Sequence, residues 1–217
     1  MHAHLVPRET GWIEVVTGCM FSGKTEELIR RIRRAQYARQ NVIVFKPGVD
    51  NRYSEDSVGS HSGMRIRSWQ ITSASEIPSR VADVQVVGID EAQFLGNDLP
   101  QICEDLANHG KRVIVAGLDT DYLGRPFEPI PHLLAIAEYI TKNLAICVVC
   151  GNPADRSQRV VNRAARVLIG EADAYEARCR LHWNPHNFDP VQVPLALGVN
   201  RAETSGGAED AAAEELP

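Results

Sequence analysis

The sequence predicts an α/β protein in which a parallel sheet is covered by helices on both faces. Short runs with the character of buried strands alternate with longer segments whose apolar residues recur at helical spacing. The runs 84–89 and 113–118 are apolar nearly throughout, which is typical of strands that are buried on both faces. In sheets of this kind, ligands bind beyond the carboxyl ends of the strands.

The elements follow one another as strand, helix, strand. The predicted strands cover 13–17, 42–45, 84–89 and 113–118, and the predicted helices cover 26–40, 99–109 and 132–142. The first helix has one apolar face, made of Leu28, Ile29, Ile32, Ala35 and Ala38. Its other face is interpreted as solvated and carries Arg30, Arg31, Arg33, Arg34 and Arg39. Residues 46–69 are polar and rich in Gly and Ser, which indicates a loop that orders with ligand.

A phosphate-binding motif joins the first strand to the first helix. Its sequence is Gly18-Cys19-Met20-Phe21-Ser22-Gly23-Lys24-Thr25, which has the pattern G-x-x-x-x-G-K-T. Between a strand and a helix, successive backbone N–H groups can point at phosphate oxygens. Lys24 would reach the β- and γ-phosphates and the Thr25 hydroxyl would bind Mg²⁺. A chance Gly-rich turn is the alternative, and the order of the flanking elements disfavours it.

An acidic pair ends the strand 84–89. Asp90 is predicted to hold Mg²⁺ together with Thr25, as the corresponding Asp does in P-loop enzymes. Glu91 is predicted to be the base that accepts the proton of an acceptor hydroxyl. The alternative is a solvent-exposed acidic turn. Gly18, Asp90 and Asp119 all follow predicted strands, which favours a common site at that edge of the sheet.

Two short-spaced ligand pairs predict a structural zinc site. Cys147 and Cys150 form a C-x-x-C, and Cys179 and His182 form a C-x-x-H. Three thiolates and an imidazole fill all four tetrahedral positions, so no position remains for a catalytic water. His186 is a less regular alternative for the fourth ligand. The other two cysteines, Cys19 and Cys103, are expected to be unpaired, and Cys19 to be packed and inert.

Composition and charge exclude several classes of protein. The chain has 217 residues, 44% of them hydrophobic, and a formal net charge of −5. An acidic chain offers no electrostatic footprint for nucleic acid or an anionic membrane. No apolar run approaches the roughly 20 residues of a membrane-spanning helix, and the first residues lack the apolar core of a signal peptide. We therefore expect a soluble cytoplasmic protein without nucleic-acid or membrane partners.

These motifs together resemble the zinc-containing (type II) thymidine kinase family, over about residues 11–183. The resemblance is carried by Gly18 to Thr25, by Lys46-Pro-Gly-Val-Asp-Asn-Arg-Tyr53, by Gly88-Ile-Asp-Glu-Ala-Gln-Phe94, by Ala116-Gly-Leu-Asp119 with Arg125-Pro-Phe127, and by the Cys/His set. The chain departs from the family pattern at Cys19, where Pro is frequent, and at His182, where some members have Cys. Residues 162–166 are also unusual for the family.

The resemblance implies a P-loop (RecA-like) sheet with a small zinc-binding lasso domain. It implies transfer of the ATP γ-phosphate to the 5′-hydroxyl of thymidine, or of deoxyuridine, in pyrimidine salvage for DNA synthesis. Glu91 would be the catalytic base, with ATP, Mg²⁺ and structural Zn²⁺ as cofactors. A homotetramer with dTTP as feedback inhibitor is also implied. The expected parts are a flexible leader (1–10), the kinase domain (11–143), the zinc-binding and lasso domain (144–190) and a disordered acidic tail (191–217).

The same resemblance implies two sets of binding residues. ATP would contact residues 18–25 together with Asp90, Glu91, Ala92 and Gln93. Thymidine would contact Met20, Phe94, Leu118, Tyr122, Phe127, Ser157, Arg166, Val167, Leu168, Ile169, Gly170 and Tyr175. The lasso, roughly 152–175, would close over the base, and Arg52 and Arg159 would lie near the phosphates.

Two other functions fit the motifs without the family. One is an ATPase that hydrolyses ATP to drive motion, in which Glu91 would polarise water; the acidic charge and small size disfavour a motor on DNA. The other is a zinc-containing interaction module that binds nucleotide without chemistry, which the intact Lys24, Thr25, Asp90 and Glu91 disfavour.

Overall fold

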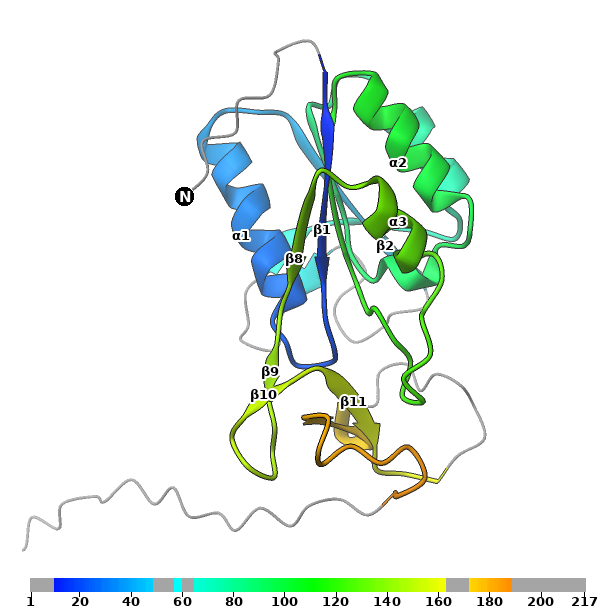
Figure 1. The fold of residues 1–217 in the computed structure, drawn as a ribbon. Coiled ribbons are helices and arrows are strands. Elements are labelled where there is room, and N and C mark those ends of the chain that lie inside the picture. The colour runs from blue at the N-terminus through cyan, green and yellow to red at the C-terminus, as the bar shows by residue number, and fades with distance from the viewer. Residues whose placement is uncertain (1–9, 49–56, 60–64, 163–171, 189–217) are drawn as a thin grey trace, which may run out of the picture.

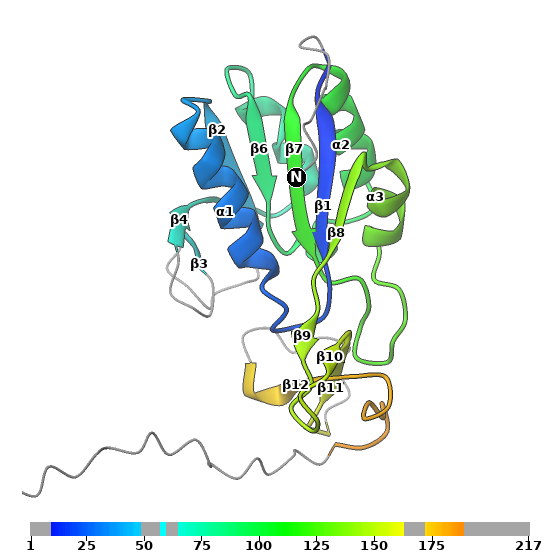
Figure 2. The same cartoon turned by 60° about the vertical axis from the view of Figure 1, so that its left-hand side comes forward.

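The computed structural model describes residues 10–48, 57–59, 65–162 and 172–188. These residues form a six-stranded sheet in the order β5-β2-β6-β7-β1-β8, and all of its paired strands are parallel. Helices cover both faces, and a smaller unit of short hairpins lies at one end of the sheet (Figures 1 and 2). The predicted α/β fold class is therefore confirmed. None of the helices in these ranges is long and apolar enough to cross a membrane.

The predicted strands and the first two helices are present, with small shifts at their ends. The sheet and its helices are β1 (Trp12–Thr17), α1 (Lys24–Tyr37), β2 (Val42–Pro47), β5 (Trp69–Ile71), β6 (Val86–Ile89), α2 (Leu99–Asn108), β7 (Arg112–Gly117), α3 (Ile130–Ile136) and β8 (Tyr139–Lys142). Short 3-10 turns cover Ala74–Glu76, Pro78–Arg80 and Ala92–Phe94.

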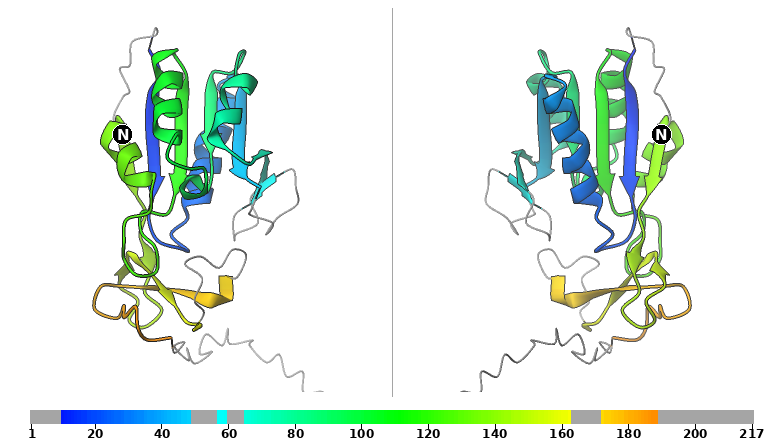
Figure 3. Two further views of the ribbon diagram at one scale, coloured as in Figure 1. Left: turned by 90° about the vertical axis from the view of Figure 1, so that its right-hand side faces the viewer. Right: turned by 90° about the vertical axis from the view of Figure 1, so that its left-hand side faces the viewer.

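The core lies in two layers, one on each face of the sheet. Helix α1 covers one face and α2 and α3 cover the other (Figure 3). Successive residues of β1 alternate between the layers: Val15 packs with the cluster under α2 and α3, and Val16 packs with the cluster under α1. Each fully buried aliphatic side chain contributes about 1.5–3 kcal/mol relative to an exposed one. This double burial explains why the strands read as continuous apolar runs.

One charged residue interrupts the apolar run of β1. Glu14 is buried, and its carboxylate accepts hydrogen bonds from Trp12 Nε1 at 2.8 Å, Arg31 Nη1 at 2.8 Å and Arg112 Nε at 2.6 Å. Arg31 also donates to Thr141 on β8 and to Glu27 on α1. The prediction that Arg31 lies on a solvated face was therefore wrong: it ties α1 to the sheet. Arg30, Arg33, Arg34 and Arg39 are exposed as predicted, and Ala38, predicted to face the core, is exposed as well.

The prediction of one helix over 132–142 was wrong in its second half. Helix α3 ends at Ile136, and Tyr139–Lys142 forms strand β8, which pairs in parallel with β1. Leu133, Ile136 and Ile140 fit helical spacing, but Tyr139, Ile140 and Thr141 are also good strand formers. Pairing with the open edge of β1 decides between the two, because it satisfies a row of backbone hydrogen bonds.

The prediction of one loop over 46–69 was also partly wrong. The chain there includes the antiparallel strands β3 (Ser57–Gly59) and β4 (Arg65–Arg67), and β5 begins at Trp69 and pairs with β2. Strands this short carry too little hydrophobic pattern to be recognised in sequence.

The small unit consists of residues 145–162 and 172–188. Strands β9 (Ala145–Ile146) and β10 (Pro153–Ala154) form one hairpin, and β11 (Arg156–Arg159) pairs with β12 (Tyr175–Arg178). Its apolar cluster is made of small side chains, Ala145, Cys147, Ala154 and Ala177, with Cys179 packed against them, and Cys19 of the phosphate-loop motif completes the cluster. The predicted leader and tail lie outside the described residues, apart from residue 10, and the predicted domain boundaries remain predictions.

Candidate active site and metal centre

The phosphate-loop motif lies where it was predicted, between β1 and α1. Gly18 has φ +143, and a Cβ there would lie 2.2 Å from the carbonyl oxygen of Asn143, so only glycine fits. The first backbone hydrogen bond of α1 runs from Glu27 N to the carbonyl of Gly23. The Lys24 ammonium donates to the carbonyl of Cys19 at 2.7 Å, which folds the side chain back across the loop.

A buried polar atom of the loop supports binding of an anion. Ser22 is buried, and its Oγ has no hydrogen-bond partner among the residues that the structure describes. An unsatisfied buried hydroxyl is unfavourable unless a ligand or water completes it. The loop thus fits a phosphate group on its chemistry as well as on its sequence.

The loop also rests on the small unit. The Cys19 thiol is fully buried and donates to the carbonyl of Ala154 at 3.3 Å, and the backbone N–H of Met20 donates to Ser157 Oγ at 3.0 Å. Burial raises the pKa of the Cys19 thiol, which keeps it protonated and unreactive. The predictions that Cys19 and Cys103 are unpaired, and that Cys19 is packed, are confirmed. Met20 and Ser157, both predicted to contact thymidine, are in direct contact.

The acidic pair meets the loop at the carboxyl end of β6. Thr25 Oγ1 lies 3.1 Å from Asp90 Oδ2, so the two predicted Mg²⁺ ligands are adjacent. Hydroxyl and carboxylate oxygens are ligands that Mg²⁺ prefers, and these two residues fit that ion. Burial, and then the charge of Glu91, raises the pKa of Asp90 to about 7. Burial lowers the pKa of Lys24, against the favourable charges of Glu91, Cys19 and Asp90.

Glu91 is held by Gln93. Glu91 has φ 49, a left-handed conformation that is uncommon for residues other than glycine and costs about 1–3 kcal/mol. Gln93 is buried; its Nε2 donates to Glu91 Oε2 at 2.6 Å, and its Oε1 accepts the backbone N–H of Leu118 at 3.1 Å. Because that N–H can only donate, it fixes the Gln93 oxygen toward β7 and the NH₂ group toward Glu91. Gln93, predicted to contact ATP, here orients the predicted base; Ala92 beside it is buried in the core.

The aromatic residues predicted to bind thymidine form two pairs. Phe94 and Phe127 pack edge to face, with ring centroids 5.9 Å apart and planes at 89°. Tyr122 and Tyr175 are joined by Arg159, whose guanidinium carbon lies 3.7 Å from the Tyr122 ring centroid and 5.4 Å from that of Tyr175. Arg159 also donates to the Tyr175 hydroxyl at 2.8 Å.

Arg159 is fully buried between these tyrosines. The resemblance implied a place near the phosphates, and this stays a prediction; the described contacts put the guanidinium of Arg159 against the rings of Tyr122 and Tyr175. Leu118, which follows β7, lies beside Gln93, because its backbone N–H donates a hydrogen bond to the Gln93 side chain. The other expected residues, Arg52, Arg166, Val167, Leu168, Ile169 and Gly170, lie outside the described residues.

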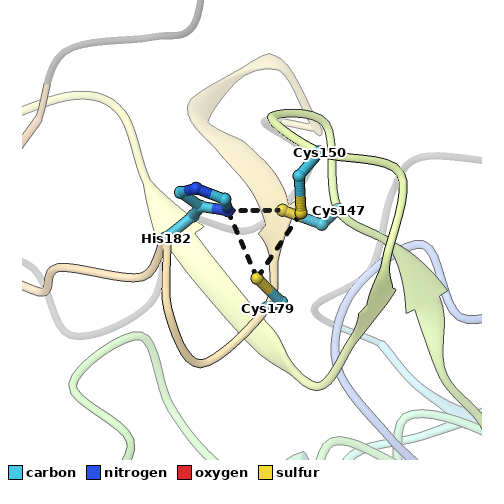
Figure 4. Close-up of side chains that lie close together, drawn as sticks. All are labelled: Cys147, Cys150, Cys179 and His182. Carbon is cyan, nitrogen blue, oxygen red and sulfur yellow. Dashed lines mark hydrogen bonds between the residues drawn. The ribbon is translucent and has the colours of Figure 1, made fainter.

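The four predicted metal ligands are gathered in the small unit (Figure 4). Their ligand atoms all lie within 4.8 Å of one another. Cys150 Sγ is 3.8 Å from Cys179 Sγ, and His182 Nδ1 is 3.3 Å from Cys179 Sγ and 3.8 Å from Cys147 Sγ. In a tetrahedral site with Zn–S of about 2.3 Å and Zn–N of about 2.0 Å, the ligand atoms are about 3.5–3.8 Å apart. The site fits zinc, with His182 and not His186 in the group of four.

The surroundings of Cys147 favour the thiolate that a metal needs. Burial opposes ionisation, but hydrogen bonds from the backbone of Cys179, Val149 and Cys150 and from His182 lower the pKa of Cys147 to about 6. Backbone N–H groups at a metal-binding turn stabilise sulfur in its charged form.

Sequence reasoning missed several residues that build the site. Gln158 is buried and donates through Nε2 to the carbonyls of Asn184 and Asn187, at 2.7 and 2.6 Å. Trp183 donates to the carbonyl of Tyr122 at 3.2 Å. Neither residue belongs to a short motif, so no signal marked them. Glu14 did carry a signal, since a carboxylate inside an apolar strand needs buried partners.

The fold and the site together define a class: α/β proteins with a phosphate-loop motif after the first strand, an acidic pair at the end of another strand and a separate four-ligand metal centre. A family model described as "Thymidine kinase" matches residues 11–183. A thymidine kinase of Rhodothermus sp. (strain ITI 518) is 58% identical over 175 residues, covering 81% of this chain and 82% of the relative. A thymidine kinase of Bdellovibrio bacteriovorus is 57% identical over 182 residues, covering 83% and 89%. The chain belongs to the thymidine kinase family.

Proposed function

We propose that this protein transfers the γ-phosphate of ATP to the 5′-hydroxyl of thymidine, giving thymidine monophosphate for DNA synthesis. Membership of the thymidine kinase family supports this substrate. The observation that carries the proposal is the Glu91 carboxylate, which Gln93 holds at the edge of the sheet where its charge also acts on Lys24 and Asp90.

Each residue of the site has a role in this reaction. Residues 18–25 bind the phosphates of ATP, and Lys24 leaves the carbonyl of Cys19 to offset charge on the transferred group. Magnesium, when bound by Thr25 and Asp90, neutralises charge on the phosphate oxygens. Glu91 accepts the proton of the 5′-hydroxyl of thymidine, while the 5′-oxygen attacks the γ-phosphorus of ATP in line.

Thymidine is proposed to lie against the aromatic pairs. Flat rings stack on aromatic faces or pack against their edges, and Phe94, Phe127, Tyr122 and Tyr175 offer both. Met20 and Ser157 join the phosphate loop to this region, so the two substrates would meet where the loop rests on the small unit. The segment 152–175 is proposed to close over the base.

The test of the base is Glu91→Gln, assayed for thymidine monophosphate. The amide cannot accept the proton, so turnover should fall about 100-fold or more while ATP binding is retained. Glu104→Gln is the matched control, because Glu104 is exposed on α2, away from the phosphate loop, and should leave turnover unchanged. Near-normal turnover of Glu91→Gln would refute the assignment.

Assaying each nucleoside in turn tests the substrate. Phosphorylated thymidine is expected as product. Comparing kcat/KM for thymidine and deoxyuridine measures how much the 5-methyl group of the base contributes to recognition. ATP hydrolysis at a rate that no nucleoside changes would support the ATPase, and absence of any phosphorylated product would support the interaction module.

The metal centre is proposed to hold one structural zinc ion per chain. Metal analysis of the purified protein should give about one equivalent, as expected for a single site with four ligands. Folded, active protein without zinc would contradict this proposal.

A homotetramer and inhibition by dTTP are proposed as finer properties. Strand β8 lies at one edge of the sheet; Ile140 on β8, Leu144 after it and Ile146 on β9 are exposed, which favours association of chains. Light scattering measures the assembly, and inhibition kinetics against thymidine measure the effect of dTTP. A cytoplasmic location is proposed from membership of the thymidine kinase family.

A further inference from the structure

Trp183 connects the metal centre to the loop that carries Tyr122. It directly follows the ligand His182, and its backbone N–H donates to the carbonyl of the ligand Cys179 at 3.0 Å. Its indole Nε1 donates to the carbonyl of Tyr122 at 3.2 Å. A single side chain therefore spans from the metal-binding turn to the β7–α3 loop, residues 118–129.

The indole is fitted to this loop by shape as well. Gly124 has φ +73, and a Cβ there would lie 2.9 Å from Trp183 Cη2 and 3.2 Å from Cζ2. On the small unit, the Arg156 guanidinium lies over the indole with its carbon 5.2 Å from the ring centroid. Trp183 is thus packed between β11 and the tip of the loop.

The tip of the loop is shaped by its own hydrogen bonds, and the base of the loop is joined to the sheet by the ion pair of Asp119 with Lys142. Asp121 Oδ1 accepts the backbone N–H groups of Leu123 and Arg125, each at 3.0 Å, and the Asp121 carbonyl accepts the N–H of Gly124 at 2.9 Å. These bonds shape the turn without joining it to the small unit. Among the described contacts, Trp183 on the Tyr122 backbone and Arg159 on the Tyr122 ring join the loop to the small unit.

We propose that Trp183 is a positioning residue that holds the β7–α3 loop, and with it Tyr122, in the orientation that receives the nucleoside base. This role rests on the proposed thymidine site. It assigns to the metal centre a function beyond folding of the small unit, because the turn formed by Cys179 and His182 fixes the backbone from which the indole reaches the loop.

Amide hydrogen exchange tests the contact without any assay of activity. Trp183→Leu removes both the N–H donor and the ring, so the amides of 123–125 should exchange about fivefold faster, the factor that one lost neutral hydrogen bond typically carries. Trp183→Phe keeps a ring and loses only the donor, so it should show a smaller increase at the same amides. Trp69→Leu is the matched control, since Trp69 is half-exposed on the edge strand β5, three strands away from β7 and its loop.

Kinetics separate positioning from a general loss of structure. In Trp183→Leu the KM for thymidine should rise about fivefold, while kcat and the KM for ATP stay near the values of the unaltered protein. A merely structural role would lower kcat and raise both KM values together.

Two results would overturn the inference. One is unchanged exchange of the amides of 123–125 in Trp183→Leu. The other is a variant that loses activity toward both substrates in parallel. If the unaltered protein does not phosphorylate thymidine, the proposed function fails, and the exchange measurement still decides whether Trp183 holds the loop.

Discussion

The sheet buries large aliphatic side chains on both of its faces, such as Ile114 under α1 and Ile89 under α2 and α3, whereas the apolar cluster of the small unit contains only alanine and cysteine among its described residues. Small side chains remove little apolar area from water, so burial alone stabilises such a unit weakly. The small unit has polar contacts in their place: the Cys147/Cys150/Cys179/His182 cluster, and Gln158 and Arg159, which are both buried. The predictions below test this difference, beginning with the largest expected effect.

Removal of the metal should unfold the small unit and leave the sheet folded. Binding of structural zinc stabilises small domains by about 10–16 kcal/mol, far more than this apolar cluster can supply. After treatment with a chelator, amides of β9–β12 should lose protection from hydrogen exchange while those of β1 and β7 keep it.

Cysteine variants provide the control for metal removal. Cys150→Ser should act like the chelator, whereas Cys103→Ala, on α2 and outside the metal centre, should keep the bound metal. Equal loss of protection in both regions on chelation would show that the sheet depends on the metal too.

In the sheet, Glu14→Gln should be the most harmful polar change. It removes the buried carboxylate that pairs with Arg31 and Arg112, whose side chains are 12% and 19% exposed, and removing one partner of a buried pair costs up to about 3–5 kcal/mol. Urea unfolding at neutral pH measures the loss. Glu104→Gln, on the exposed side of α2, should change the free energy of unfolding by less than about 0.5 kcal/mol, and a similar loss in both variants would refute the special role of Glu14.

In the small unit, Gln158→Leu should destabilise the contact between β11 and the segment that follows the last metal ligand. The side chain accepts the N–H of Asn184 and donates to the carbonyls of Asn184 and Asn187, and unsatisfied buried groups cost about 1–3 kcal/mol. Exchange of the Asn184 amide should accelerate. Gln101→Leu, on the exposed face of α2, should not alter it.

The smallest expected effect is a dependence of the free energy of unfolding on acid pH, which comes from Glu27. Hydrogen bonds from Arg30, despite some desolvation, and from Arg31 lower the pKa of Glu27 from 4.5 to about 2. Because the folded pKa is the lower one, the stabilisation is present above about pH 4.5 and is lost as the pH falls from there toward about 2. Unfolding free energies measured between pH 5 and 3 should fall less steeply in Glu27→Gln, and an unchanged slope would contradict the assignment.

The comparison of sequence with structure separates local signals from contacts made at a distance. The strand–loop–helix around Lys24, the acidic pair and the two ligand pairs were all predictable, because each depends on residues a few positions apart. Strand β8 was not, since Tyr139–Lys142 has a pattern compatible with either element and only the free edge of β1 selects the strand. Gln93 illustrates the same limit: the sequence marks it as part of a motif, while its bond to Leu118 decides that it orients Glu91.

The sequence by itself determined the fold class, the phosphate loop, the predicted base and the metal ligands, because backbone periodicity and ligand spacing are local properties. Only the tertiary structure decided how the two regions are joined. Cys19 and Met20 rest on the small unit, and Trp183 reaches across to Tyr122. These contacts join residues 61 to 137 positions apart in the chain, and their geometry arises only when the parallel sheet brings its strand ends to one edge and the small unit folds against it.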